Sequence, residues 1–254
     1  MFGTEMKTNN GKLVAAIAII AMIACCLTVV SFDSVDAEPA TAFDPASEGV
    51  ITVNTDGVNL AENTTITDRL AINGTLTVPA GVTLTINYNF DTAGESIITF
   101  GNTGCLDVQG TVIINANNVD DSTYTSPSNN HVFNTSSTTY ANDTIKVSGN
   151  LTINENTAVK GVLNYGNLSM VVTSGNVVIN GNGMSTTYIQ QSGGNVDITL
   201  NDGSVSAYVD ITGGSFTVGG ENQTNADSAI FTPYAMHVGD GATFTANGKV
   251  GIYS

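Results

Sequence analysis

Seven asparagines stand two residues before a serine or a threonine, which is the spacing that N-glycosylation requires. These candidate acceptors are Asn63, Asn73, Asn134, Asn142, Asn150, Asn167 and Asn222. The modification also needs a host that exports the protein past the glycosylating enzymes. Asn134 and Asn142 lie in a polar stretch without hydrophobic periodicity, so we expect them to be the most accessible of the seven.

Residues that could bind a metal or activate a nucleophile occur in weak patterns. The pairs Asp202-Gly203 and Asp240-Gly241 suit turns and could hold Ca²⁺, but no regular calcium-binding nonapeptide repeat is present. His131 and His237 are too few and too separated for a zinc site. The sequence has no Gly-x-Ser-x-Gly elbow and no phosphate-binding loop. We therefore predict no catalytic residues, no metal site and no cofactor, with Ca²⁺ at turns as the alternative.

Aromatic and amide side chains could instead bind a glycan. A groove lined by tyrosine and asparagine would support this function, because such side chains combine apolar surface with hydrogen-bonding groups. The candidate tyrosines are Tyr124, Tyr140, Tyr165 and Tyr188.

A repeated aliphatic pattern predicts the elements that must carry these side chains. Three copies alternate around a central glycine: Leu70, Ile72, Gly74, Leu76, Val78; Leu106, Val108, Gly110, Val112, Ile114; and Ile145, Val147, Gly149, Leu151, Ile153. Alternation at a period of two places the aliphatic side chains on one face of a strand. The glycine would let that strand bend. We expect the aliphatic residues of the three copies to form equivalent parts of one core ladder.

The spacing of these copies predicts stacked coils of roughly twenty residues each, and roughly eight to ten coils over residues 50–254. A single coil cannot bury its aliphatic side, whereas neighbours above and below close the core and pair every backbone group in parallel ladders. Repeated asparagines near the turns should form side-chain ladders along the axis. The predicted class is all-β, a parallel β-helix or β-solenoid. An antiparallel β-sandwich is the alternative.

The first 37 residues resemble a secretory leader. Lys7 and Lys12 precede an apolar run over residues 13–30, and small residues precede a predicted cleavage site between Ala37 and Glu38. An uncleaved apolar anchor helix is the alternative, since the run is about the length of a minimal transmembrane helix. The basic flank keeps the amino end in the cytoplasm in both cases, so the β-region would lie outside the cell.

The remaining chain divides by composition. Residues 38–49 form a lead-in, and residues 50–254 form the solenoid. Residues 115–144 are rich in asparagine, serine and threonine and predict a polar excursion, with a short strand at residues 131–133. This excursion is either a binding loop or a tolerated, glycosylated insertion.

Charge and cysteine content restrict the partners. The formal net charge is −16, which argues against nucleic acid and against docking on anionic lipid, so membrane contact would involve only the N-terminal segment. Cys25 and Cys26 lie in the leader, which leaves Cys105 without an intrachain disulfide partner. We expect Cys105 to be a buried small apolar residue.

The segment from Leu70 to Val78, with Pro79-Ala-Gly-Val-Thr-Leu84 after it, resembles the right-handed parallel β-helix of pectate-lyase-like proteins. It is especially similar to the adhesin-like surface proteins of archaea and bacteria. This resemblance covers most of residues 50–254 through a pattern that many exported repeats share. It implies a non-catalytic role at the cell surface.

One segment resembles a catalytic motif of β-helical polygalacturonases, namely Asn54-Thr55-Asp56-Gly57. Those enzymes use several carboxylates to protonate the leaving oxygen and to activate water. The companion motifs are incomplete here, because Asp120-Asp121 is remote, His131 lacks flanking glycines and Ile145-Lys146 lacks the arginine. A lyase would need a basic proton abstractor beside bound Ca²⁺, and the chain has only six lysines and arginines. A turn is the alternative interpretation of the segment.

We therefore expect a secreted or cell-surface structural, adhesin-like glycoprotein without catalytic activity. The alternatives are an extracellular glycan-binding module and a polysaccharide lyase or hydrolase. The expected partners are surface glycans or, by end-to-end self-association, further copies of the chain.

Overall fold

The computed structural model describes residues 43, 49–90, 94–118, 130–135, 144–155, 168–181, 184–200, 204–220, 231 and 233–248. The chain divides into two compact units, Met1–Pro39 and Ala40–Ser254, and every described residue belongs to the second. The predicted leader, its cleavage site at Ala37 and Glu38, and most of the lead-in lie outside the described residues. In the part of the chain that is described, no helix is long and apolar enough to cross a membrane.

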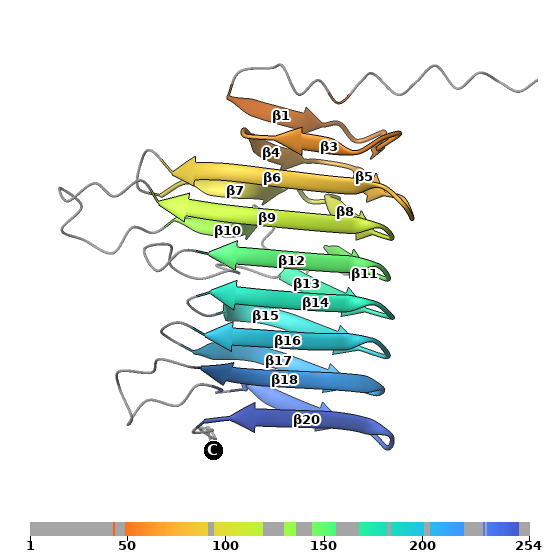
Figure 1. The fold of residues 1–254 in the computed structure, drawn as a ribbon, viewed down its shortest axis with the longest axis vertical. Helices are drawn as coiled ribbons and strands as arrows, with labels where there is room; N and C mark the ends of the chain where they lie inside the picture. Colours follow the sequence, from red (N-terminus) through yellow and green to blue (C-terminus); the bar gives the residue numbers. More distant parts are fainter. Residues whose placement is uncertain are drawn as a thin grey trace, which may run out of the picture. The chain divides into compact units, whose positions relative to one another are not determined.

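The described strands form three parallel sheets, which are three faces of one coiled stack (Figure 1). Face 1 holds β1 (Val50–Val53), β4 (Arg69–Ile72), β7 (Ser96–Phe100) and β10 (His131–Thr135). Face 2 holds β2 (Val58–Asn59), β5 (Thr75–Val78), β8 (Cys105–Val108), β11 (Ile145–Val147), β13 (Leu168–Val172), β15 (Met184–Gln191), β17 (Val205–Ile211) and β19 (Ala235–Val238). Face 3 holds β3 (Thr64–Ile66), β6 (Thr83–Phe90), β9 (Thr111–Asn118), β12 (Asn150–Glu155), β14 (Asn176–Gly181), β16 (Asn195–Leu200), β18 (Gly214–Gly220) and β20 (Ala242–Asn247).

This arrangement confirms the parallel β-helix. On faces 2 and 3, each strand pairs with the equivalent strand of the neighbouring coil. Each of these two faces has eight described strands, which define eight coils. The coil length varies: Asn176 pairs with Asn195, whereas Thr111 pairs with Asn150. Every pairing between the described strands is parallel, as in β12 with β9 and β14, so the sandwich alternative is wrong.

Alternating side chains build the core between the three faces. Along β12, Leu151 and Ile153 point inward and are fully buried, while Thr152 between them points outward and is half-buried. Leu151 stacks between Val112 and Val177 of the neighbouring coils. All twelve aliphatic residues of the three sequence copies are buried, with at most 1% of their surface exposed. Burying a valine, leucine or isoleucine side chain stabilises a fold by about 1.5–3 kcal/mol, so this continuous column is the main source of cohesion.

The three copies are not equivalent, which corrects the sequence interpretation. The first copy runs from face 1 to face 2 through β4 and β5, whereas the other two run from face 2 to face 3. Ile72 therefore pairs with Phe100 on face 1, while Val108 pairs with Val78 and Val147 on face 2. The hydrophobic periodicity could not show that the first copy lies on different faces from the other two, because strands of all three faces have the same alternation.

The glycine of each copy lies at a corner between two strands, not within a bent strand as the sequence suggested. Gly110, Gly149 and Gly175 stack at the corner between faces 2 and 3, and Gly194 and Gly214 continue the column. The carbonyl of Gly110 accepts the N–H of Asn150 at 2.8 Å, and this bond recurs between later coils. A Cβ on Gly149 would lie closer than 3.0 Å to that carbonyl oxygen. Close stacking of the coils thus requires glycine at this corner.

Gln191 adds a side-chain bridge at the same corner. Its side chain is buried, and its Nε2 donates to the carbonyl oxygens of Gly194 at 3.1 Å and Ser215 at 3.0 Å. These acceptors belong to successive coils, so one amide satisfies backbone groups of both.

The structure places part of the predicted excursion inside the stack. Residues 115–118 continue β9 and pair with β6, and the strand expected at residues 131–133 is present as β10. Residues 119–129 and 136–143 lie outside the described residues. Cys105 also differs from expectation, because it is half-buried on the outward side of β8 and not in the core.

Candidate functional site

The segment that resembles a polygalacturonase motif forms a turn between β1 and β2. The N–H of Gly57 donates to the carbonyl of Asn54 at 3.0 Å, and the backbone at Gly57 is left-handed, with a φ of 78°. Asp56 is exposed at this turn. Asp120-Asp121 and Asp202 fall outside the described residues, and within the described ones no three His, Cys, Asp or Glu side chains gather as a metal site.

The candidate glycosylation sites that are described differ in accessibility. Asn63 and Asn150 are exposed, whereas Asn73 and Asn134 are half-buried. Asn134 is thus less accessible than expected, because it belongs to β10 and pairs with Thr99 of β7. Asn142, Asn167 and Asn222 lie outside the described residues.

Two asparagine ladders run along face 3, as the sequence predicted. In the first ladder, the side-chain amide of each asparagine donates through Nδ2 to Oδ1 of the asparagine in the preceding coil. The bonds run from Asn115 to Asn87 at 2.7 Å, from Asn154 to Asn115 at 2.9 Å and from Asn180 to Asn154 at 3.0 Å. The second ladder joins Asn150, Asn176, Asn195 and Ser215 at 2.7–3.0 Å. Both ladders pair outward polar side chains of successive coils, so they stabilise the stack and leave hydrogen-bonding groups at its surface.

An open hollow of about 600 Å³ lies beside the first ladder. It is lined by Asn87, Asn89, Asn115, Asn117, Asn154 and Glu155. The asparagines present amide donors and acceptors, and Glu155 is almost fully buried. This amide surface can bind polar groups, and the described residues that line it include no nucleophile with an adjacent base.

The first ladder provides a test of inter-coil bonding. Asn154→Ala removes two amide bonds, so we expect it to lower the free energy of unfolding by about 2 kcal/mol, at about 1 kcal/mol for each bond. Asn180→Ala removes one of those two bonds and should cost about 1 kcal/mol. In urea unfolding, the double variant should cost about 1 kcal/mol less than the sum of the single variants, because the shared bond is lost only once. Strict additivity would contradict the ladder.

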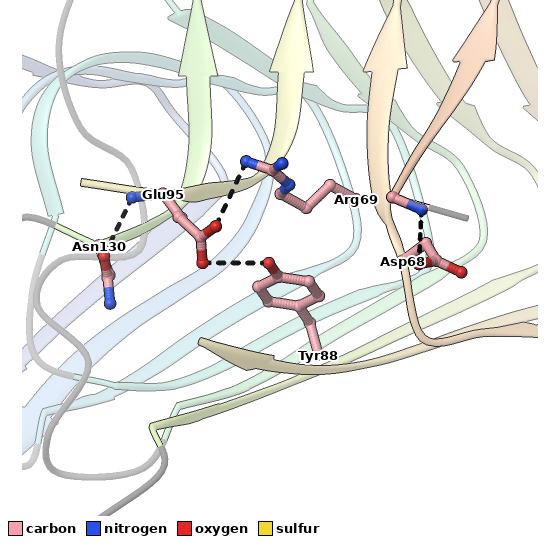
Figure 2. A network of polar contacts seen from close by, with 6 residues as sticks. Asp68, Arg69, Tyr88, Glu95 and Asn130 are labelled. Carbon is pink, nitrogen blue, oxygen red and sulfur yellow. Dashed lines mark hydrogen bonds and ion pairs between the residues drawn. The ribbon is translucent and has the colours of Figure 1, made fainter. Parts of the chain in front are cut away.

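A polar network joins the coils where the strands of face 1 begin (Figure 2). Glu95 is at its centre: its carboxylate lies 3.5 Å from the Arg69 guanidinium and accepts the Tyr88 hydroxyl at 3.1 Å. The N–H of Glu95 donates to the Asn130 side chain at 3.0 Å. In the same view, Asp68 accepts the backbone N–H of Gly49 at 3.3 Å.

This network has the geometry of a structural clamp. A glycosidase needs two carboxylates that flank the bond to be cleaved. Glu95 is instead held by an arginine and a tyrosine, and Asp68 is engaged with a backbone N–H. The contacts link β4 and β6 to the segments that precede β7 and β10, so they fix the stagger of successive coils.

A tyrosine ladder lies on face 2: Tyr188 and Tyr208 are on the outward sides of β15 and β17, and the ring of Tyr234, directly before β19, packs against Tyr208. The rings of Tyr188 and Tyr208 are 6.3 Å apart and inclined by 41°, and those of Tyr208 and Tyr234 are 5.2 Å apart and inclined by 34°. Tyr208 lies between the buried Ala207 and Val209, so its half-buried ring points away from the core. Tyr234 is 46% exposed.

A polar column runs beside the tyrosine ladder: Gln190 and Asp210 each lie two residues after a tyrosine of the ladder, and His237 lies three residues after Tyr234. Parallel pairing aligns Gln190 with Asp210, and Asp210 with His237. The Asp210 carboxylate lies 2.8 Å from Nδ1 of His237, and Gln190 Nε2 lies 3.5 Å from the Tyr188 hydroxyl. On β15 and β17 the two columns are about 7 Å apart, the rise of two strand residues. Together they form a partly exposed strip with an aromatic side and a hydrogen-bonding side.

Sequence reasoning found one member of this strip. Tyr188 was among the candidate glycan-binding tyrosines, while Tyr124, Tyr140 and Tyr165 lie outside the described residues. Tyr208 and Tyr234 were missed. Tyr208 follows Tyr188 by one coil of the predicted length, and this spacing could have identified the pair.

No protein-family model, no curated protein and no solved structure matches the chain in sequence or fold comparison. The architecture alone therefore defines the class of protein, which is a parallel β-helix with side-chain ladders on its outer faces.

Proposed function

We propose that the chain is a secreted or surface-displayed, adhesin-like structural protein without catalytic activity. The observation that carries the proposal is the outward display of regular ladders on a continuous aliphatic core. Outer side chains of successive coils form surfaces that extend over several coils, as in solenoids that bind partners along an extended face. The leader-like N-terminus and the resemblance to adhesin-like surface proteins support the location.

The chemistry of the described surfaces favours contact over catalysis. The candidate catalytic turn presents Asp56, which belongs to no cluster of three His, Cys, Asp or Glu side chains in the described part of the chain, and the Glu95 carboxylate is held by Arg69 and Tyr88. The outer faces offer amides, hydroxyls and tyrosine rings, which bind ligands without activating a nucleophile.

This function is tested on cells that express the full chain. We expect intact cells to expose the protein to a membrane-impermeant label and to added protease. We also expect the purified protein to release no reducing ends and no unsaturated products from neutral or acidic polysaccharides. Retention inside the cell, or release of either product, would contradict the proposal.

A glycan-binding module is the second candidate, and the tyrosine ladder on face 2 favours it.

Self-association end to end remains a separate prediction. Sedimentation of the purified chain over a range of concentrations should show assembly, and a strict monomer would exclude it.

A further inference from the structure

We infer that the tyrosine ladder and its polar column bind a neutral polysaccharide chain that lies along the solenoid axis. The inference deepens the proposed adhesive function by naming the face and the ligand class. It rests on the placement of Tyr188, Tyr208 and Tyr234 over three successive coils.

The aromatic side of the strip fits the apolar face of a sugar. A pyranose ring presents C–H groups on its faces and hydroxyl groups around its edge. Tyrosine offers a large, rigid apolar surface at a small cost in conformational entropy. The three rings repeat with the coils at 5.2 and 6.3 Å, so consecutive sugar units would meet a similar surface at each coil.

The polar column supplies partners for the hydroxyl edge. Gln190 presents an amide, Asp210 a carboxylate and His237 an imidazole, all on the outward side of the same strands. These groups include both donors and acceptors, which suits hydroxyls that do both. The side chains of Asp210 and His237 keep 36% and 66% of their surface exposed, so a ligand can reach them.

The negative charge of the chain and of the strip favours a neutral ligand. The chain carries a net charge of −16, and Asp210 lies within the strip itself. Among the described residues, Lys146 is the lysine of face 2, and it is three coils away from Asp210 in the same outward column. A polyuronate or sulfated chain would meet repulsion here, whereas a neutral chain would not.

Substitution of Tyr208, the central ring of the ladder, is the main test of binding. We expect the full chain to be retarded in gels that contain a neutral mannan or β-glucan, but not in gels that contain polygalacturonate. Tyr208→Ala should weaken the association about tenfold, equivalent to about 1.4 kcal/mol. Tyr208→Phe keeps the ring, and Val171→Ala alters the same face without removing a ring, so both should bind within about twofold of the wild type.

Fluorescence provides an independent readout. The chain lacks tryptophan, so its emission comes from tyrosine, and the neutral polymer should change that emission in the wild type but much less in Tyr208→Ala. If Tyr208→Ala does not fold, the exposed Tyr234→Ala should show the same loss of binding.

Three outcomes would overturn the inference: equal binding by the alanine variants, binding of polygalacturonate alone, or no binding of either neutral polymer. Surface labelling of cells tests the adhesive location separately, so either proposal can fail while the other stands.

Discussion

We expect Gly175→Ala to lower the free energy of unfolding by about 4 kcal/mol, the sum of backbone strain and steric overlap. Gly175 has a φ of 73°, a left-handed conformation that costs an alanine about 1 kcal/mol. Its added Cβ would overlap the carbonyl oxygen of Gly149 in the preceding coil. That oxygen accepts the N–H of Asn176 at 3.0 Å, so relieving the overlap would weaken the inter-coil ladder.

Thermal unfolding followed by circular dichroism measures this effect, and we expect the Tm to fall by about 10 °C. Gly241→Ala is the matched control, because Gly241 lies in the turn between β19 and β20, at the corresponding corner of another described coil, with a φ of 85° and nothing within 4 Å of its added Cβ. It should retain only the strain, about 1 kcal/mol. Equal losses in the two variants would show that stacking does not constrain the corner.

Periodicity predicted the core but not its division into faces. The alternation around Leu151 and Ile153 predicted their burial, because a period of two separates inward from outward residues on any strand. It could not show that Ile72 belongs to another face than Val108. The hydrophobic pattern of a strand reports its burial, whereas its neighbours depend on coil lengths that polar insertions change.

The outer ladders show a similar limit. Repeated asparagines predicted amide ladders, because identical side chains stack wherever parallel strands are in register. The partners within a ladder depend on that register: Asn115 meets Asn154 across 39 residues, and Asn154 meets Asn180 across 26. The sequence identified only Tyr188 of the tyrosine ladder. Tyr208 and Tyr234 belong to it because β15 pairs with β17 and because the rings of Tyr208 and Tyr234 lie close together, which the sequence alone does not show.

The glycine corner was recognised for the wrong reason. Glycine within a strand pattern commonly marks a bend or a close approach of another backbone. The sequence pattern was interpreted as a bend within a strand, whereas the structure shows that the backbones of Gly149 and Gly110 approach each other closely. The contact joins residues far apart in sequence, so local pattern could not distinguish the two.

A second large effect is expected from substitutions that test which side chains of β12 point inward and which point outward. An asparagine is placed on each side of the strand in turn. Ile153→Asn should lower the free energy of unfolding by about 4 kcal/mol, because it loses buried apolar surface and leaves an amide without hydrogen-bond partners. Ile153 is fully buried between Ile114 and Ile179 of the adjacent coils, so water cannot reach an amide placed there.

Thr152→Asn places the same side chain one residue away on the outward side, where the amides of Asn150 and Asn154 already form ladders. We expect this control to change the free energy of unfolding by less than about 0.5 kcal/mol. Urea unfolding of both variants gives the comparison. Similar losses would mean that β12 is not held in one register, since a shift by one residue exchanges the two sides. A loss confined to Ile153→Asn would fix the inward side of the coil and, with it, the side on which the ladders are displayed.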